Sequence, residues 1–300
     1  MRVLALGSCR VHQPLDAAEL RSDIKYLNRH SWWWPPIYVH DVHEAIQLVR
    51  LGRGEIRMPT EIRPFAYESG LRWRYRVPLP LPLQRAEYVV VEICTDKHYE
   101  VGGWTLNVNE IHRHLRQGTG AAGEAWWLAI ERGQRPSEAL AQGVEAELRA
   151  RWRTRWRFGE GHRLVLRELA FRYLSASEIA EGMARLQTLV ARPLLVVPHV
   201  TVRLADGSLL AERLQHVEKT VEAARTLGLP VLDPRTFVGR DGQSRALDKD
   251  GTDFNHYAQD YLPVVGREIV EALRDLPQEN FNPVSHQPAV GSERISMPGD

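Results

Sequence analysis

Short apolar runs recur along the chain and are separated by longer segments with helical periodicity. The clearest runs cover residues 3–6, 87–95, 192–200 and 229–237. Uninterrupted runs of this length are typical of strands buried on both faces of a parallel sheet. A weaker strand candidate covers residues 23–31. Because the runs alternate with helical segments, the pattern predicts βαβ units and an α/β fold with a parallel sheet of about five strands.

The segment from 109 to 191 has almost no strand character and is rich in Ala, Leu, Glu and Arg, which favour helices. We expect a helical insertion there, inside a single domain that covers residues 1–275. The last helix is predicted over Asn255 to Leu273. Residues 276–300 are polar and contain prolines, which predicts a flexible C-terminal tail.

Composition narrows the function classes. The chain has 300 residues, of which 43% are apolar, and its formal charge is only +1. This balance provides no overall field to attract nucleic acid or an anionic membrane. No apolar stretch approaches the roughly 18 residues of a membrane helix, and the N-terminal run is too short for a signal peptide. We therefore expect a cytoplasmic protein without a membrane span; its oligomeric state cannot be read from the sequence.

The two cysteines, Cys9 and Cys94, do not indicate a disulfide-stapled scaffold. They would lie close together if the first and third strands are neighbours, but a closed zinc site needs four ligands, and the chain has no CxxC or HxxxH pair. Buried thiols and no metal are expected. The glycine patterns of dinucleotide-binding and P-loop proteins are also missing after the first strand.

Polar residues follow the predicted strands. Ser8, Cys9 and Arg10 follow the first, Asn28, His30 and Ser31 the second, Asp96 and Lys97 the third, and His199 the fourth. Ligands of open parallel sheets bind beyond the carboxyl ends of the strands, so these residues are expected along one rim. They are the candidate substrate-binding residues.

A possible catalytic set joins the two ends of the chain. Asp253 stands three residues before His256 in "GTDFNHY" and can accept a hydrogen bond from one ring nitrogen, which leaves the other nitrogen as a base. Such a base activates a serine hydroxyl, and Ser8 follows Gly7, which permits a tight turn at the strand end. The alternative for Ser8 is a helix cap without catalysis.

Two sequence blocks, Gly7-Ser8 in "LGSCR" and Asp253 to His256 in "DFNH", resemble the SGNH (GDSL-like) hydrolase superfamily. The resemblance implies a flavodoxin-like three-layer α/β/α sandwich. It also implies Ser8 as nucleophile, His256 as general base and Asp253 as the residue that orients it.

The middle of the chain departs from that pattern. "LNRHSW" and "ICTDKH" stand where the superfamily has an oxyanion-hole glycine and a Gly-x-Asn-Asp block. Substitute oxyanion donors are the backbone N–H groups of Ser8 and Cys9, with a side chain from Asn28, His30 or Asn107.

"GSC" and "VEIC" also look like the divergent GSCFA-type and WcbI-type branches found among polysaccharide-biosynthesis proteins. The resemblances together imply a Ser-His-Asp ester hydrolase or O-acyltransferase that acts on a carbohydrate or similar alcohol ester, without a resident cofactor. Two alternatives stay open. One is a coenzyme-A-dependent acetyltransferase in which His256 or His199 activates the sugar hydroxyl directly, and the other is a catalytically silent carbohydrate-binding scaffold.

The nine tryptophans are expected mainly in the core, although indole rings also stack on sugars. They include the cluster at 31–36, Trp104 and the pair at 126–127. In "RARWRTRWRFG" (149–159), Leu148, Trp152 and Trp156 form one apolar stripe at helical spacing, which predicts a packed amphipathic helix rather than a phosphate-binding segment.

Overall fold

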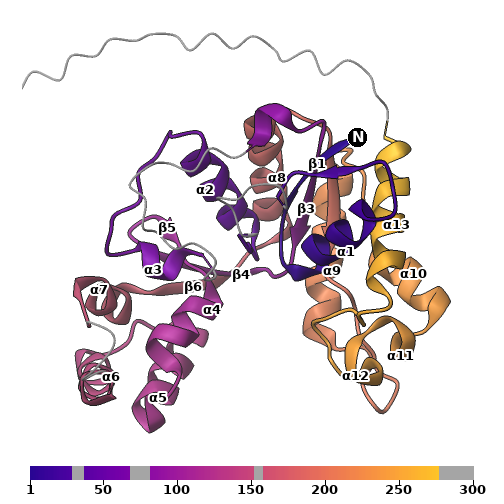
Figure 1. Cartoon of the computed structure of the whole chain (residues 1–300). Coiled ribbons are helices and arrows are strands. Elements are labelled where there is room, and N and C mark those ends of the chain that lie inside the picture. The colour runs from indigo at the N-terminus through magenta and orange to yellow at the C-terminus, as the bar shows by residue number, and fades with distance from the viewer. Residues whose placement is uncertain (29–36, 68–81, 152–157, 277–300) are drawn as a thin grey trace, which may run out of the picture.

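The computed structural model describes residues 1–28, 37–67, 82–151 and 158–276. Its centre is a parallel sheet in the order β2-β1-β3-β7. The strands are β1 (Arg2–Leu6), β2 (Lys25–Tyr26), β3 (Tyr88–Ile93) and β7 (Leu194–Pro198). The predicted apolar runs therefore form the sheet, with the flavodoxin-like strand order, and the α/β prediction is confirmed (Figure 1).

The run at 229–237 forms a single parallel bridge, between Val231 and Val196, instead of a fifth strand. Two backbone hydrogen bonds form this bridge: Val196 N donates to Pro230 O, and Leu232 N donates to Val196 O. Pro230 has no N–H to continue the ladder, and Pro234 begins helix α10 (Pro234–Asp241). The two prolines explain why the pairing stops there.

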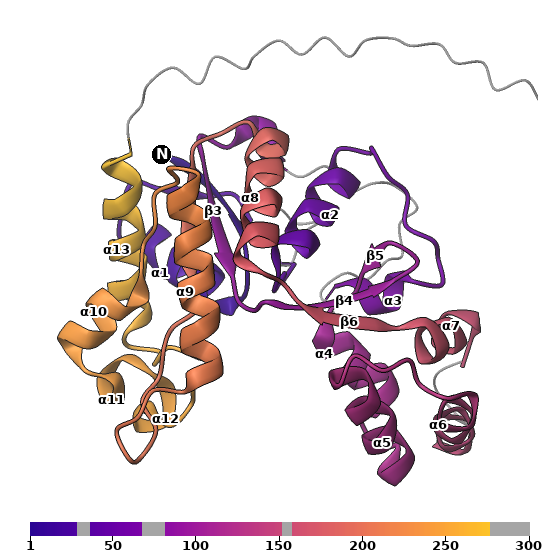
Figure 2. The same ribbon diagram turned by 180° about the vertical axis from the view of Figure 1, so that it is seen from behind.

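Helices cover both faces of the sheet. Alternate strand residues such as Leu4 and Val91 pack with α2 (Val42–Gly52), α8 (Ala176–Val190) and α9 (Ala211–Thr226). The residues between them, such as Val3 and Val90, pack with α1 (Cys9–Glu19) and α13 (Leu262–Arg274). Both views show these layers (Figures 1 and 2). Because every β3 position is buried, this strand needs apolar residues on both faces, and Glu92 is its one charged exception.

A second, antiparallel sheet was not predicted. It has the order β5-β4-β6 and consists of β4 (Lys97–Val101), β5 (Trp104–Thr105) and β6 (Ala170–Tyr173). Gly102 and Gly103, both with positive φ, form the turn between β4 and β5. The prediction of an all-helical segment is wrong at β6, because this short, mostly exposed edge strand has no apolar run to mark it.

The other helical elements before β6 vary in length. They are α3 (Arg63–Ala66), η1 (Pro82–Arg85), α4 (Val108–Ile111), η2 (His112–Arg116), α5 (Gly120–Glu131), α6 (Glu138–Arg151) and α7 (Glu160–Glu168). Trp126 and Trp127 on α5 are buried, and Trp126 Nε1 donates a hydrogen bond to Leu166 O at 2.9 Å. The core prediction is confirmed for this pair, whereas residues 31–36, Trp152 and Trp156 lie outside the described residues.

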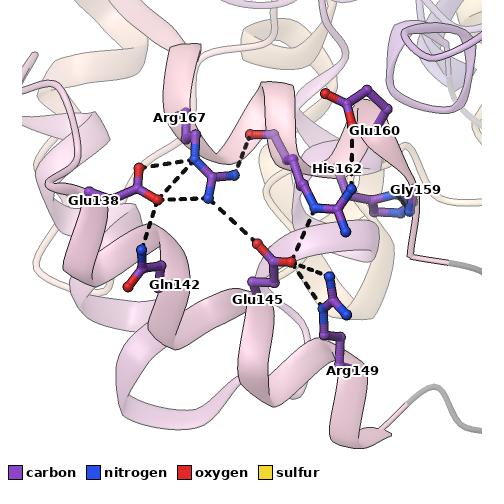
Figure 3. A network of polar contacts seen from close by, with 9 residues as sticks. Glu138, Gln142, Glu145, Arg149, Gly159, Glu160, His162 and Arg167 are labelled. Carbon is purple, nitrogen blue, oxygen red and sulfur yellow. Dashed lines mark hydrogen bonds and ion pairs between the residues drawn. The ribbon is translucent and has the colours of Figure 1, made fainter.

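A network of carboxylates and arginines joins α6 to α7 (Figure 3). Arg167 contacts Glu138 at 2.7 Å, and Glu145 accepts from Arg149 at 2.6 Å and from Arg163 at 3.2 Å. These arginines are partly exposed, and such pairs contribute about 0–1 kcal/mol each. The apolar residues beneath them, including the fully buried Leu148, hold the two helices together.

The C-terminal helix begins later than predicted. Between α10 and α13 the chain forms α11 (Gln243–Ala246) and α12 (Asp248–Gly251), and α13 starts at Leu262 with Pro263 in its first turn. Residues 253–261 form a loop, and this loop carries Asp253 and His256. The predicted tail at 276–300 lies almost wholly outside the described residues, and no helix within them is long and apolar enough to span a bilayer.

Candidate active site

A cavity of about 1140 Å³ lies at the carboxyl ends of β1, β3 and β7. Its lining includes Ser8, Cys9, Arg10, Cys94, Asp96, Lys97 and His199 from the strand ends, Arg213, His216 and Lys219 from α9, and Asn255 and His256 from the loop before α13. Residues of β4, α4 and β6 contribute Tyr99, Asn109 and Tyr173. The predicted rim residues at the first, third and fourth strands thus lie together in one cavity wall.

Gly7 allows β1 and β3 to approach closely at the edge of the cavity. A Cβ on this residue would lie 2.6 Å from Glu92 Cβ and 2.7 Å from Val11 Cγ2. Gly7 is not among the residues with positive φ. The glycine is therefore needed for space, and not for the unusual turn conformation that the sequence suggested.

Ser8 is bound to a buried carboxylate. Its Oγ donates to Glu92 Oε2 at 2.7 Å, and its backbone N–H donates to the same oxygen at 2.9 Å. Ser8 also caps α1, because its Oγ accepts from Arg10 N at 3.3 Å. The backbone N–H of Ser8 is consequently occupied, which corrects its predicted role as an oxyanion donor.

Arg10 completes this buried group. Its Nε lies 2.6 Å from Glu92 Oε1, with side-chain exposures of 8% for Arg10 and 1% for Glu92. Burial opposes ionisation of Glu92, but the Arg10 charge and the hydrogen bonds from Ser8 hold the pKa of this carboxyl below its ordinary value. Glu92 is thus a fixed anion that draws the Ser8 proton, and a poor base for removing it.

Asp253 and His256 form the hydrogen-bonded pair that their spacing predicts. His256 Nδ1 lies 3.1 Å from Asp253 Oδ1 and 3.2 Å from Oδ2. A hydrogen bond from the Asn255 N–H, together with His256, lowers the pKa of Asp253 to about 2, so the carboxylate is ionised at neutral pH. The His256 imidazole is half exposed and lines the cavity. Ser8 and His256 are both described residues, and no hydrogen bond joins their side chains.

Cys9 is the first residue of α1, and its partly exposed side chain lines the cavity together with His256. A helix N-terminus stabilises an anion such as a thiolate. Cys94 differs, because it is buried and burial raises the pKa of its thiol well above the ordinary value. Neither cysteine is in a disulfide.

Asn28 and Asn107, the two described residues among the predicted side-chain oxyanion donors, do not line the cavity. Asn28 exchanges two hydrogen bonds with the backbone of Ala5, at 2.9 and 3.0 Å, and so extends the pairing of β2 with β1. Asn107 is fully buried and caps α4, where its Oδ1 accepts from Asn109 N at 3.0 Å. Both residues have structural roles, while His30 and Ser31 lie outside the described residues.

His199 is buried at the end of β7, and its Nδ1 lies 2.7 Å from a guanidinium nitrogen of Arg213. Nδ1 also lies 2.9 Å from Val200 O, so the guanidinium requires an acceptor at this nitrogen while the carbonyl requires a donor. Burial and the charges of Arg10 and Arg213 keep the pKa of His199 well below its ordinary value. The ring is therefore neutral at pH 7, and its low pKa makes it a weak base.

Sequence reasoning missed several cavity residues. Glu92 was detectable as a charge inside the apolar run "YVVVEI". Arg213, His216 and Lys219 are spaced three residues apart on α9 and therefore share one face of that helix. Lys219 Nζ lies 2.6 Å from Asp96, a predicted site residue, and this pair closes one side of the cavity.

Residues 1–272 match a family model described as the TviD N-terminal domain. A curated relative, the Vi polysaccharide biosynthesis protein TviD of Salmonella typhi, is 23% identical over 272 residues, which cover 90% of this chain and 30% of that protein. Among solved structures, an inhibitor-bound aryl esterase of M. smegmatis is 10% identical, with a TM-score of 0.38 over 92% of this chain and 99% of that chain.

Proposed function

This chain belongs to the TviD N-terminal domain family, and we propose that it moves acyl groups to or from hydroxyls of a polysaccharide, as an O-acyltransferase or ester hydrolase. The alignment covers only 30% of the curated relative, whose name refers to polysaccharide biosynthesis. The observation that carries the proposal is the His256–Asp253 pair, which shares a cavity with Cys9 and Ser8 at the first turn of α1.

We assign the base to His256 and its orientation to Asp253, as the sequence predicted. The nucleophile predicted from the sequence is Ser8, but its hydroxyl proton is directed at Glu92, and its side chain is buried. Cys9 is the next residue, is more exposed and lies at a helix N-terminus. The hydrogen bond from Ser8 to Glu92 and the greater exposure of Cys9 favour Cys9 as nucleophile, with Ser8 positioning the turn through Glu92.

The reaction then has two steps. The Cys9 thiol gives its proton to His256, and the sulfur attacks the acyl carbonyl of the donor. The bond to the leaving group breaks, and the leaving group takes the proton from His256. In the second step His256 removes a proton from a sugar hydroxyl or water, whose oxygen attacks the thioester carbonyl. The carbon–sulfur bond breaks, and His256 returns the proton to the Cys9 sulfur.

Coenzyme A binding and acyl release distinguish this proposal from its two alternatives. A coenzyme-A-dependent acetyltransferase would bind coenzyme A in the cavity, and binding to the folded state raises the melting temperature. A catalytically silent scaffold would bind carbohydrate without acyl release. The backbone N–H of Cys9 is the oxyanion donor that this proposal retains, since the Ser8 N–H is engaged by Glu92.

The proposed function is tested by His256→Ala. General acid–base catalysis contributes about 10²–10⁴-fold, so acetyl release from p-nitrophenyl acetate is expected to fall by that factor. Asp253→Asn should produce a smaller loss, and Gln259→Ala, an exposed position on the same loop, should produce none. Initial rates measured at pH 7 distinguish these results. Equal rates in His256→Ala and the wild type would remove His256 from the chemistry and refute the proposed function for this ester.

A further inference from the structure

Arg213 is a cation without a carboxylate partner. Its guanidinium donates to His199 Nδ1 at 2.7 Å, Phe254 O at 3.0 Å and Asn255 Oδ1 at 3.2 Å, with Val200 O at 3.4 Å. All these acceptors are neutral. In the part of the chain that the structure describes, no Asp or Glu oxygen lies within 4.0 Å of this guanidinium.

Two neighbouring cations of the cavity are matched. Arg10 is paired with Glu92 at 2.6 Å, and Lys219 with Asp96 at 2.6 Å. Glu92 and Asp96, the carboxylates at the strand ends, are therefore already used, whereas Lys97 and Glu212 line the cavity without an ion pair among the described residues. Arg213 is left as a partly buried positive charge that faces a second one on Arg10.

The uncompensated Arg213 charge destabilises the folded protein when no ligand is bound. Burial and the nearby Arg10 charge lower the pKa of Arg213 to about 10, which still leaves it protonated at neutral pH. A desolvated charge destabilises a fold unless an opposite charge compensates it. A bound anion in the cavity would provide that compensation and would lower the cost.

His216 provides a second, independent indication of a ligand. It follows Arg213 by three residues on α9, lines the same cavity and is 3% exposed. Its Nε2 donates to Ile93 O at 3.0 Å, so Nδ1 is an acceptor. This buried Nδ1 has no hydrogen-bond partner among the described residues. A ligand hydroxyl would satisfy it.

We propose that Arg213 binds an oxyanion of the substrate, a carboxylate or phosphate group, while His216 Nδ1 accepts a hydrogen bond from a hydroxyl on the same ligand. The assignment of this cavity to substrate rests on the proposed function, but the binding itself does not require acyl transfer. The two sources of such an oxyanion are an acidic sugar unit of the acceptor and the phosphates of a nucleotide-bearing acyl donor.

Two matched ligand pairs distinguish these sources. D-glucuronate is compared with D-glucose for the acceptor, and coenzyme A with pantetheine for the donor, with dissociation constants measured by ligand-observed NMR. We expect the anionic member of one pair to bind at least about tenfold tighter than its neutral counterpart. Arg213→Gln should reduce this preference to less than about threefold, and Arg213→Lys should retain part of it.

Arg225→Gln is the matched control, because Arg225 is exposed at the last turn of the same helix, and it should keep the full preference. Circular dichroism and thermal melting confirm that each variant is folded. The proposal is overturned if neither pair shows a preference in the wild type, or if the preference survives in folded Arg213→Gln. A preference that depends on Arg213, in a protein whose ester cleavage does not depend on His256, would refute the proposed function and leave the anion site intact.

Discussion

Cys9→Ala is expected to abolish acyl-enzyme formation, with a loss of about 10⁴-fold or more in the single-turnover rate, while Ser8→Ala stays within about tenfold of the wild type. The reason is the different placement of the two side chains. Ser8 Oγ donates to an ionised carboxylate at 2.7 Å, whereas Cys9 lines the cavity at the start of α1. Removing the nucleophile removes the covalent step, but removing Ser8 Oγ takes away one hydrogen bond of a positioning group.

Rapid mixing of p-nitrophenyl acetate with excess enzyme measures this step directly. Thermal melting of each variant separates a chemical defect from unfolding, and Cys94→Ala, the buried thiol in the same wall, is the matched cysteine control. A burst that persists in Cys9→Ala and disappears in folded Ser8→Ala would return the nucleophile to Ser8. A burst that persists in both variants would exclude both residues as the nucleophile for this ester.

Glu92→Gln is expected to lower the free energy of unfolding by about 3–5 kcal/mol, because it leaves the Arg10 guanidinium buried without its counter-ion. Glu92 also accepts both hydrogen bonds of Ser8, so the first turn of α1 should loosen with it. Urea denaturation at pH 7 measures the change. Glu87→Gln is the control: Glu87 pairs with Arg2 at 3.1 Å on the surface, where a pair contributes about 0–1 kcal/mol.

The Arg10–Glu92 ion pair makes the free energy of unfolding depend on pH. The folded-state pKa of Glu92 lies below its unfolded value of about 4.5, so the unfolded chain binds more protons between the two values. The stabilisation is therefore complete above about pH 4.5 and is lost as the pH falls through the folded pKa. The stability gap between the wild type and Glu92→Gln should narrow in acid. A gap that stays constant down to acid unfolding would contradict the ion pair as its source.

The central sheet could be predicted because strands buried on both faces leave apolar runs that stand out along the chain. β3, with six buried residues, is the clearest case. β2 has two residues and β6 is mostly exposed, so neither produces such a run. The start of α13 was misplaced because Gly251 and Thr252 are typical of a turn and a helix cap, whereas residues 253–261 form the loop that carries His256.

The contacts of the site also fall into those that the sequence predicts and those that only the fold creates. Asp253 and His256 are three residues apart, so their contact follows from local geometry and was predictable. The contacts of Ser8 with Glu92 and of Arg213 with His199 join residues that are 84 and 14 positions apart, and the fold alone brings them together. Sequence patterns identified the rim of the cavity, but they could not show that the Ser8 proton is directed away from His256.

The most direct test of the proposed chemistry is to locate the acyl group on the enzyme. Wild-type protein is incubated with an activated acetyl ester in the absence of acceptor, quenched in acid and digested with trypsin, which releases residues 3–10 as one peptide. We predict the mass of one acetyl group on Cys9, removable by neutral hydroxylamine as expected for a thioester. An acetyl group on Ser8, or turnover of the ester with this peptide never modified, would contradict a Cys9 acyl-enzyme.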